Sequence, residues 1–385
     1  MILPYSIALP NIFVILLALV WLKDLFTGKL THTFKYNFIY ILPFILLFLA
    51  YLVSILYSAD TKEALATIER RIPVLALPLI IISIPLRRQS INTIFKAFIL
   101  SVALCCIIAL LLTINYFVNN PSEYYLEKAL WYLPQTINFH APYLALYLVV
   151  SNILCLYFYG TKDKRGLIFF VFVLNNTFLF LISSRAALAV NWFFIAALST
   201  YYLSKSKGLI LAVLNLVVIG AICYVAYVNV PYLHTKISKL TEAGYGLGHR
   251  AIAAKAAIEV IKENPFFGVG VGDIQAELNK ELPDAAFADM NVHNQYLHEL
   301  MTYGFVGFTI FTAIFVMGFY KAITQRDLFF ALFLISLATM FLTEVILSRY
   351  LGIMLFSVFY PLFLSLHISG AHEGVQSLSY FRKNY

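Results

Sequence analysis

Residues 91–118 read INTIFKAFILSVALCCIIALLLTINYFV, an apolar stretch long enough to cross a lipid bilayer as a helix. A helix needs about 20 apolar residues to span roughly 30 Å of hydrocarbon. The whole chain shares this composition, because 62% of its 385 residues are hydrophobic and only 12% are charged. The mean hydropathy is +0.84. The sequence therefore predicts a multi-pass membrane protein.

Ten further apolar stretches bring the predicted number of transmembrane helices to about eleven. They are continuously apolar and do not alternate, which favours helices over a β-barrel. The third stretch is short, follows Arg71, ends at Pro85, and is open to a tilted or partly re-entrant path. The expected fold is all-α, in one membrane-embedded domain over residues 1–385. The predicted spans are residues 2–22, 38–57, 72–86, 91–118, 138–159, 166–183, 186–203, 208–230, 296–320, 328–347 and 350–369.

The cysteines give no sign of a disulfide or a metal site. All four lie inside apolar stretches, without a CxxC pair, and are interpreted as small buried side chains. The polar loop carries no Asp-x-Asp cluster of the kind that binds a divalent cation. We therefore expect neither a metal nor another cofactor.

The charge distribution orients the chain, since cytoplasmic loops retain Lys and Arg. With an external N-terminus, the inner loops carry a net charge of +11 and the outer side carries −3, which together give the +8 of the whole chain. The segment 231–295 is then the one long polar loop on the external side, and the C-terminus is cytoplasmic. Because this asymmetry explains the basic pI, nucleic-acid binding is not expected.

The external loop 231–295 contains a predicted helix and a glycine-rich turn. Residues 250–263 (RAIAAKAAIEVIKE) are rich in alanine, place apolar side chains on one stripe and stop at Asn264-Pro265. The following GVGVGD lacks the Lys-Ser/Thr of a P-loop and the preceding strand of a dinucleotide-binding motif. A flexible turn is favoured here over a set of backbone amides that bind an anion.

Arginines at the external ends of spans are candidate binding residues. Arg185 lies in ISSRAAL, between two spans that almost no loop separates. A charge near the bilayer interior costs about 2.5–3.5 kcal/mol on insertion scales, so Arg185 should face a cavity and hold an anion or a carboxylate. The alternative is that it reaches lipid headgroups. Arg70 and Arg349 stand at similar positions, and Glu344 is a nearby acidic partner for Arg349.

His293 and Asn294 stand at the start of the ninth span, in HNQYLHELMTYGFVG (residues 293–307). A histidine there can act as a base near neutral pH, or it can cap and anchor the helix. The two later glycines of the motif let the span pack closely, which favours the base. Glu299 can orient a histidine or an arginine, and His298 is interpreted as a packing residue.

Together these motifs resemble the O-antigen ligase and polymerase family of bacterial envelope enzymes. The resemblance rests on SSRAAL at 183–188, Arg250 with its helix, NPFFGVGVGD at 264–273 and HNQYLHELMTYGFVG at 293–307. It implies a GT-C-like fold in the bacterial inner membrane with a periplasmic active site. The family pattern has twelve spans and an internal N-terminus, whereas this chain gives eleven spans and an external one.

The resemblance implies transfer of a glycan from an undecaprenyl-diphosphate carrier to a hydroxyl. The acceptor is lipid A-core in a ligase and another lipid-linked glycan in a polymerase. By motif, Arg185 and Arg250 would bind the donor diphosphate and His293 would act on the acceptor hydroxyl. Displacement by the acceptor would invert the anomeric centre and require no metal. Candidate supporting residues are Asn294, Glu299, Arg70, Arg349 and Glu344.

A lipid-glycan flippase or other transporter is the remaining alternative. Such a protein would spread ionisable residues through the bundle to form a path. The conspicuous ionisable residues here lie at the external ends of the spans, which favours an enzyme.

Overall fold

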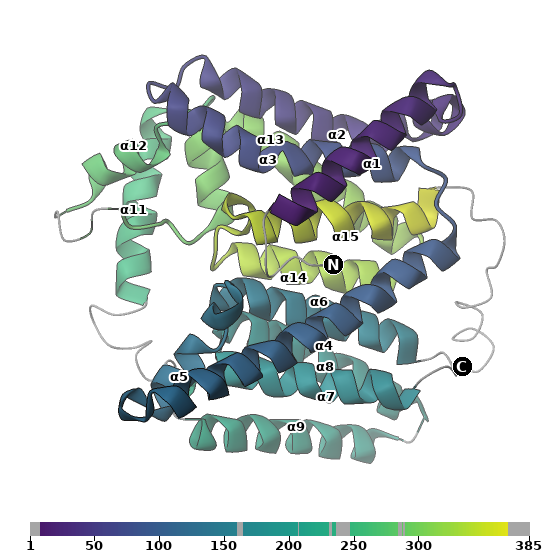
Figure 1. Ribbon diagram of the computed structural model, residues 1–385, viewed down its shortest axis with the longest axis vertical. Coiled ribbons are helices and arrows are strands. Elements are labelled where there is room, and N and C mark those ends of the chain that lie inside the picture. The colour runs from purple at the N-terminus through teal and green to yellow at the C-terminus, as the bar shows by residue number, and fades with distance from the viewer. Residues whose placement is uncertain are drawn as a thin grey trace.

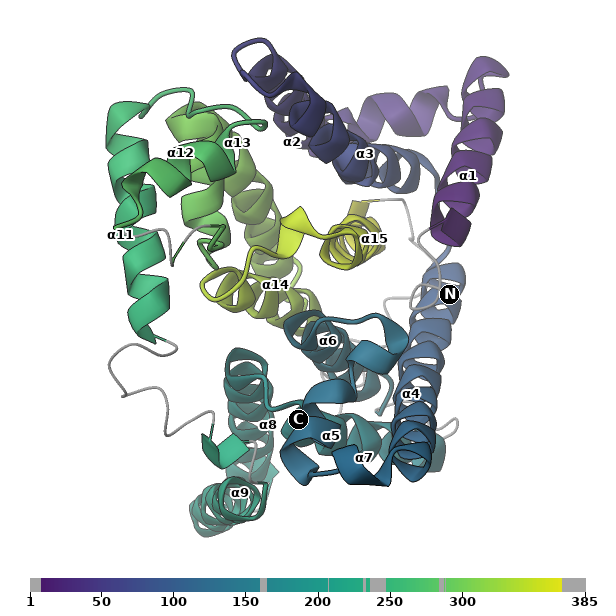
Figure 2. The same ribbon diagram turned by 60° about the vertical axis from the view of Figure 1, so that its left-hand side comes forward.

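The computed structural model describes residues 8–159, 165–206, 208–230, 233–235, 247–283, 287 and 289–368. These residues form a bundle of long helices and contain no strand (Figures 1 and 2). Seven helices in this part of the chain are long and apolar enough to cross a membrane, judged by length and composition. The predicted all-α, multi-pass membrane fold is confirmed.

Eleven helices in the described part of the chain correspond one to one to the predicted spans. They are α1 (Ala8–Phe26), α2 (Thr31–Ile55), α3 (Thr61–Ser83), α4 (Arg88–Asn119), α6 (Ala141–Tyr159), α7 (Arg165–Ile182), α8 (Arg185–Ser206), α9 (Leu209–Asn229), α13 (Gln295–Thr324), α14 (Leu328–Phe341) and α15 (Tyr350–Ile368). The shorter elements are α5 (Leu126–Tyr132), α11 (Leu247–Glu263), α12 (Ile274–Glu281) and the 3-10 turns η1 (Pro121–Glu123), η2 (Gln135–Ile137) and η4 (Ile346–Ser348). The helix expected in the polar loop is α11.

The third predicted span is wrong at its start, because α3 begins at Thr61 and not at residue 72. Asp60 caps the helix, since its carboxylate accepts a hydrogen bond from the amide of Glu63 at 2.9 Å. The first turns, TKEALATIERR, are charged and therefore lack the hydropathy of a span, although they are helical. A continuous helix of 23 residues replaces the short segment.

The tenth predicted span, 328–347, is too long, since α14 ends at Phe341. The chain then turns, and the amides of Thr343 and Glu344 both donate to the carbonyl of Met340. Three of the four residues 343–346 are β-branched, and such stiff side chains lower helix propensity. The turn places Glu344 outside both α14 and α15.

The helices α6 and α15 form the centre of the bundle, and α9 lies at its edge. In both central helices 78% of the most apolar window is buried inside the protein, against 6% in α9. Figure 1 shows α15 and α6 in the middle of the molecule and α9 at one margin. The apolar surface that α9 exposes is suited to contact with lipid.

Four buried asparagines join α6, α7 and α8. Asn175 donates to Asn152 at 3.1 Å, Asn152 donates to Asn191 at 2.9 Å, and Asn191 donates to Asn176 at 2.8 Å. In hydrocarbon, polar side chains between helices stabilise their association. The ladder therefore fixes the position of α8, which begins with Arg185.

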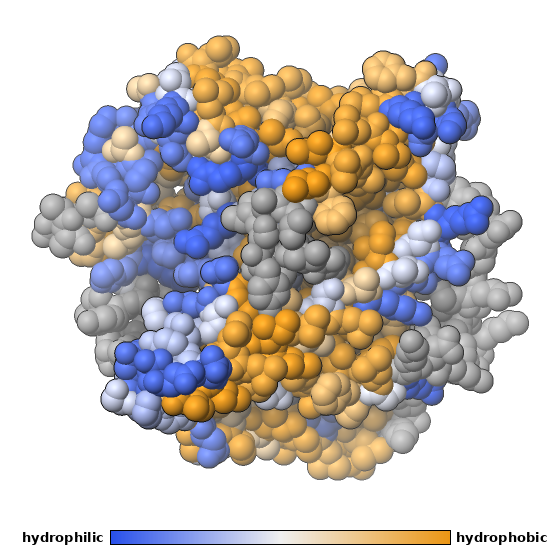
Figure 3. Space-filling view, in the orientation of Figure 1, coloured by the Kyte–Doolittle hydropathy of each residue, from blue (hydrophilic) through white to orange (hydrophobic). Residues whose placement is uncertain are grey.

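The polar surface lies at the two ends of the long helices. In Figure 3 hydrophilic residues gather at the left and right edges of the face, and hydrophobic residues cover most of the middle. The left edge carries α11 and α12 (Figure 1). The starts of α8, α11 and α13 and the turn after α14 lie at this same end. These segments carry Arg185, Arg250, His293 and Glu344.

The side of the membrane that this end faces stays a prediction, which cysteine labelling tests. With the four native cysteines replaced by alanine, we expect an impermeant thiol reagent to label intact cells carrying Lys262→Cys or Lys280→Cys. Cells carrying Lys29→Cys or Arg326→Cys should be labelled only after permeabilisation, because the inner loops retain the positive charge. The reverse pattern would contradict the orientation. The predicted cytoplasmic C-terminus, residues 369–385, lies outside the described residues.

Candidate functional site

The helix α13 is broken at Gly304, which adopts φ +59° and ψ −163°. This conformation is essentially restricted to glycine. The break withdraws two carbonyls from the helical pattern, and they accept hydrogen bonds from the polar loop instead. Val269 donates to the carbonyl of Met301 at 2.9 Å, and Gly270 donates to that of Thr302 at 3.0 Å.

The same break leaves two amides of α13 for the loop. Phe305 donates to the carbonyl of Pro265 at 2.8 Å, and Val306 donates to that of Phe266 at 3.1 Å. The backbones approach so closely that a Cβ on Gly304 would overlap the main chain of Phe266. The two motifs that define the resemblance, 264–273 and 293–307, are therefore interlocked by their backbones.

The end of the glycine-rich turn binds the connection between α2 and α3. The carboxylate of Asp273 accepts hydrogen bonds from the amides of Ala59 at 2.6 Å and Asp60 at 2.9 Å. The amide of Gly272 donates to the Ser58 hydroxyl at 3.1 Å. The predicted turn is present, and hydrogen bonds hold it to the connection between α2 and α3 and to α13. The loop amides of Val269, Gly270 and Gly272 donate to protein groups. The alternative, a loop whose amides bind an anion, therefore gains no support.

A methyl group at position 304 is expected to disrupt this interlock. Gly304→Ala would place a Cβ against the backbone of Phe266 and would strain the φ/ψ angles by about 1–3 kcal/mol. We expect a lower Tm for the purified protein and a loss of its activity. Gly220→Ala is the matched control, because a Cβ there meets open space. Equal Tm values for the two variants would contradict the interlock.

A small apolar cluster organises the end of the bundle that carries the polar loop. The side chains of Ala256 and Val260 on α11 pack in one cluster with Val292, Met301 and Val345. This packing confirms the apolar stripe predicted for the loop helix. Because α11 carries Arg250 and Val292 precedes His293, the cluster joins the elements that hold the predicted site. Val345 adds the turn that holds Glu344.

His293 lies at the entrance of α13 with its side chain outside the helix. Its backbone has φ +48°, and its amide donates to the side chain of Asn291 at 2.9 Å. Asn294 is the residue that caps the helix, because its side chain accepts from the amides of Tyr296 and Leu297 at 2.9 and 3.1 Å. The imidazole is therefore not used as the cap.

The imidazole of His293 contacts Glu344. Nδ1 lies 2.9 Å from one carboxylate oxygen and 3.3 Å from the other. The Glu344 side chain is 9% exposed and that of His293 is 34% exposed, so the carboxylate lies behind the ring. A carboxylate at Nδ1 fixes the orientation of the ring. Nε2 is then the nitrogen available to a substrate.

Arg185 and Arg250 lie within electrostatic reach of each other. Arg185 is the first residue of α8 and Arg250 is in the first turn of α11. Partial burial and the positive charge of Arg250 both lower the pKa of Arg185. Two arginines that repel each other at a half-buried site are suited to share one anion.

The remaining predicted residues separate into buried and exposed ones. Arg70 is exposed and pairs with Glu63 at 2.7 Å. Arg349 is also exposed, and its guanidinium lies 5.9 Å from the centre of the Tyr143 ring. Glu344 pairs with His293, so the pairing with Arg349 that the sequence suggested is not formed.

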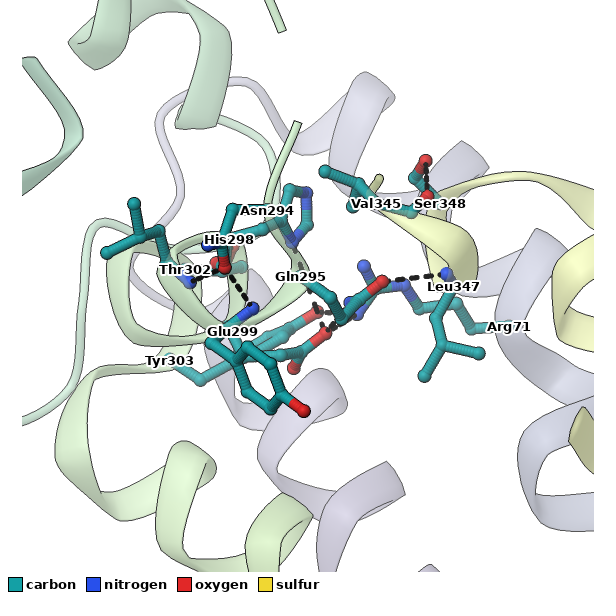
Figure 4. A network of polar contacts seen from close by, with 12 residues as sticks. Arg71, Asn294, Gln295, His298, Glu299, Thr302, Tyr303, Val345, Leu347 and Ser348 are labelled. Carbon is teal, nitrogen blue, oxygen red and sulfur yellow. Dashed lines mark hydrogen bonds and ion pairs between the residues drawn. The ribbon is translucent and has the colours of Figure 1, made fainter. Parts of the chain in front are cut away.

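Glu299 is fully buried and its charged neighbour is Arg71. The Arg71 side chain is 1% exposed, and its Nη1 lies 3.7 Å from the Glu299 carboxylate. Nη1 also donates to the hydroxyl of Tyr303 at 2.8 Å (Figure 4). The guanidinium lies 4.7 Å from the centre of the Tyr51 ring. Arg71 is missing from the predicted site. Its helical spacing from Ala64 and Ile68 places it in the apolar stripe of α3. An arginine within such a stripe is the sequence signal that could have identified it as a site residue.

The fold and these groups define a multi-pass membrane protein whose candidate site residues gather at one end of the bundle. Residues 168–312 match the family model described as O-antigen ligase. This match confirms the resemblance predicted from the motifs of the segment. No curated protein matches the chain. The matched segment contains Arg185, Arg250 and His293, whereas Arg71 and Glu344 lie outside it and reach the site through the fold.

Proposed function

We propose that this protein is an inverting glycosyltransferase that acts as an O-antigen ligase. It transfers a glycan from an undecaprenyl-diphosphate carrier to a hydroxyl of lipid A-core on the periplasmic face of the inner membrane. The family match supports glycan transfer of the ligase or polymerase type in general. The contact of His293 with Glu344, 2.9 Å at the external entrance of α13, is the observation that carries the proposal.

In the proposed reaction the acceptor oxygen attacks the anomeric carbon of the donor. The bond between this carbon and the diphosphate oxygen breaks, and its electron pair leaves with the diphosphate. The acceptor proton passes to Nε2 of His293, and Glu344 stabilises the imidazolium that forms. Because the new bond forms opposite the leaving group, the anomeric configuration is inverted.

The leaving group is the part of the reaction that requires positive charge. Negative charge develops on the diphosphate as the bond breaks, and preorganised donors that meet this charge lower the barrier. Arg185 and Arg250 are permanently charged and can each bind a phosphate bidentately. The two guanidinium groups supply this charge without a divalent cation.

The lipid part of the donor has an apolar surface to occupy at the same end of the bundle. A groove between α7 and α9 is lined by Phe180 and by Val218, Ile222 and Val225. Phe180 lies two residues before the end of α7, and Arg185 begins the next helix. A polyprenyl chain in this groove would leave its diphosphate near the arginines.

The test is a transfer assay with the purified protein in liposomes. Lipid-linked O-antigen donor is supplied together with lipid A-core, and the expected product is glycan attached to lipid A-core. A product that grows only on the lipid carrier would assign a polymerase. Absence of transfer to both acceptors would refute the proposed function.

A further inference from the structure

A buried glutamine connects the two segments that carry His293 and Glu344. Gln295 is fully buried at the start of α13. Its side-chain oxygen accepts a hydrogen bond from the amide of Leu347 at 2.8 Å (Figure 4). This bond joins the entrance of α13, next to His293, to η4, which follows Glu344 in the same connection between α14 and α15.

The contact between His293 and Glu344 and the contact between Gln295 and Leu347 join residues that lie close to each other along the chain. Gln295 follows His293 by two residues, and Leu347 follows Glu344 by three. A change in the bond between Gln295 and Leu347 must therefore move one segment relative to the other. The left-handed backbone at His293 gives the histidine no helical hydrogen bond of its own. The spacing of imidazole and carboxylate thus depends on the neighbouring contact.

The orientation of the Gln295 amide is fixed from its other end. Its nitrogen donates to the carboxylate of Glu299 at 2.7 Å. Since Glu299 accepts there, the amide oxygen must point toward Leu347 and cannot be exchanged with the nitrogen. Glu299 is itself held by the buried guanidinium of Arg71, at 3.7 Å. Arg71 thus contacts Glu299, Glu299 accepts from Gln295, and Gln295 accepts from the amide of Leu347, three residues after Glu344.

We propose that Gln295 is a positioning residue that sets the spacing between His293 and Glu344, with its amide held by Glu299 and Arg71. The inference rests on the proposed function of the His293 and Glu344 pair. A misplacement of about 1 Å at a reacting group can cost a factor of ~10² in rate. A buried amide contact one turn from the pair is placed to control such a distance.

The first test removes the hydrogen bonds and keeps the length of the side chain. Gln295→Met is expected to lower kcat of glycan transfer by a factor of ~10² with little change in KM for the donor. In a Glu344→Gln background the same change should cost only a few-fold, because the pair is already lost. A cost equal in both backgrounds would overturn the inference.

The matched control is Asn37→Leu. Asn37 is also a fully buried amide, and it donates to the carbonyl of Ile82 at 2.8 Å near the opposite end of the bundle. This variant lowers stability through the same kind of loss, but its effect on kcat should be identical with and without Glu344→Gln. The comparison separates positioning from general destabilisation.

The second test exchanges donor and acceptor. Gln295→Glu alone places two buried carboxylates side by side, and Glu299→Gln alone removes the charge that faces Arg71. The double variant restores one carboxylate and one amide, with the carboxylate now accepting from Leu347. We expect transfer by the double variant to exceed that of Gln295→Glu at least about tenfold. A double variant no better than either single one would contradict the proposed connection.

A third measurement does not depend on glycan transfer. Hydrogen exchange of the segment 343–350 should accelerate in Gln295→Met, because the amide of Leu347 loses its acceptor. Unchanged exchange would overturn the inference whatever the activity. Full transfer by Glu344→Gln would instead contradict the proposed function, and the exchange result would then decide on Gln295 separately.

Discussion

His293→Gln is expected to lower glycan transfer by a factor of ~10²–10⁴ while the protein still inserts into the membrane. Glutamine is polar and of similar reach, so it can replace a histidine that only donates a hydrogen bond. It cannot accept the acceptor proton near neutral pH. Because Asn294 caps α13 and the imidazole does not, the substitution should leave the start of the helix intact.

The measurement is kcat and KM in liposomes with saturating lipid-linked donor. His32→Gln is the matched control, since His32 is exposed and stands at the start of α2, on the opposite end of the bundle. His298 is unsuitable, because its side chain is buried 4.0 Å from Glu299. Near-full transfer by His293→Gln would contradict a role as base. Recovery of the rate at high donor concentration would assign the imidazole to diphosphate binding.

The positions of the eleven helices were predictable from their apolar composition, although only seven of them, among the described residues, reach the length and hydropathy of a membrane span. The two errors have one cause, since hydropathy reports burial in lipid and not helicity. The charged start of α3 is helical although it is polar, and the β-branched turn after α14 is apolar although it is not helical. Capping by Asp60 sets the start of α3, and the stiff β-branched side chains after Leu342 accompany the end of α14.

The site residues were predictable only where a single sequence motif contains them. His293 and the two arginines were identified from the residues around them, and their roles stay predictions. The contact of His293 with Glu344 joins residues 51 positions apart, and that of Arg71 with Tyr303 joins residues 232 apart. The sequence named both acidic candidates but assigned Glu344 to Arg349, because that arginine is close along the chain and His293 is not. The break at Gly304 was likewise hidden, because a glycine in an apolar span also permits close helix packing.

The interlock at Gly304 and the buried pair of Arg71 and Glu299 explain why so polar an arrangement persists beside hydrocarbon. The interlock places its hydrogen bonds inside the protein. The buried charge of Arg71 faces the carboxylate of Glu299 at 3.7 Å, and a buried charge is tolerated where an opposite charge lies close to it. Backbone hydrogen bonds to the polar loop thereby hold α13 near its entrance. An entrance held in place is what a transfer reaction needs if acceptor and donor are to meet in one geometry.

Arg185→Lys and Arg250→Lys are each expected to raise KM for the lipid-linked donor about tenfold or more. Lysine keeps the charge but loses the bidentate fork, and one charge-assisted hydrogen bond contributes about 1.5–3 kcal/mol. Since each 1.4 kcal/mol is a factor of ten, the loss is large enough to measure. Protein levels in the membrane should stay unchanged.

The double variant decides whether the two arginines share one diphosphate. If they do, the loss in the double variant should differ from the product of the two single losses, because each guanidinium changes the phosphate position that the other meets. Partial burial and, after it, the charge of Arg250 lower the pKa of Arg185, so the two side chains already lie within electrostatic reach in the free protein. Arg87→Lys, an exposed arginine just before α4, is the control that should leave KM unchanged. Losses that multiply independently would assign the arginines to separate sites, and unchanged KM in both single variants would remove them from donor binding.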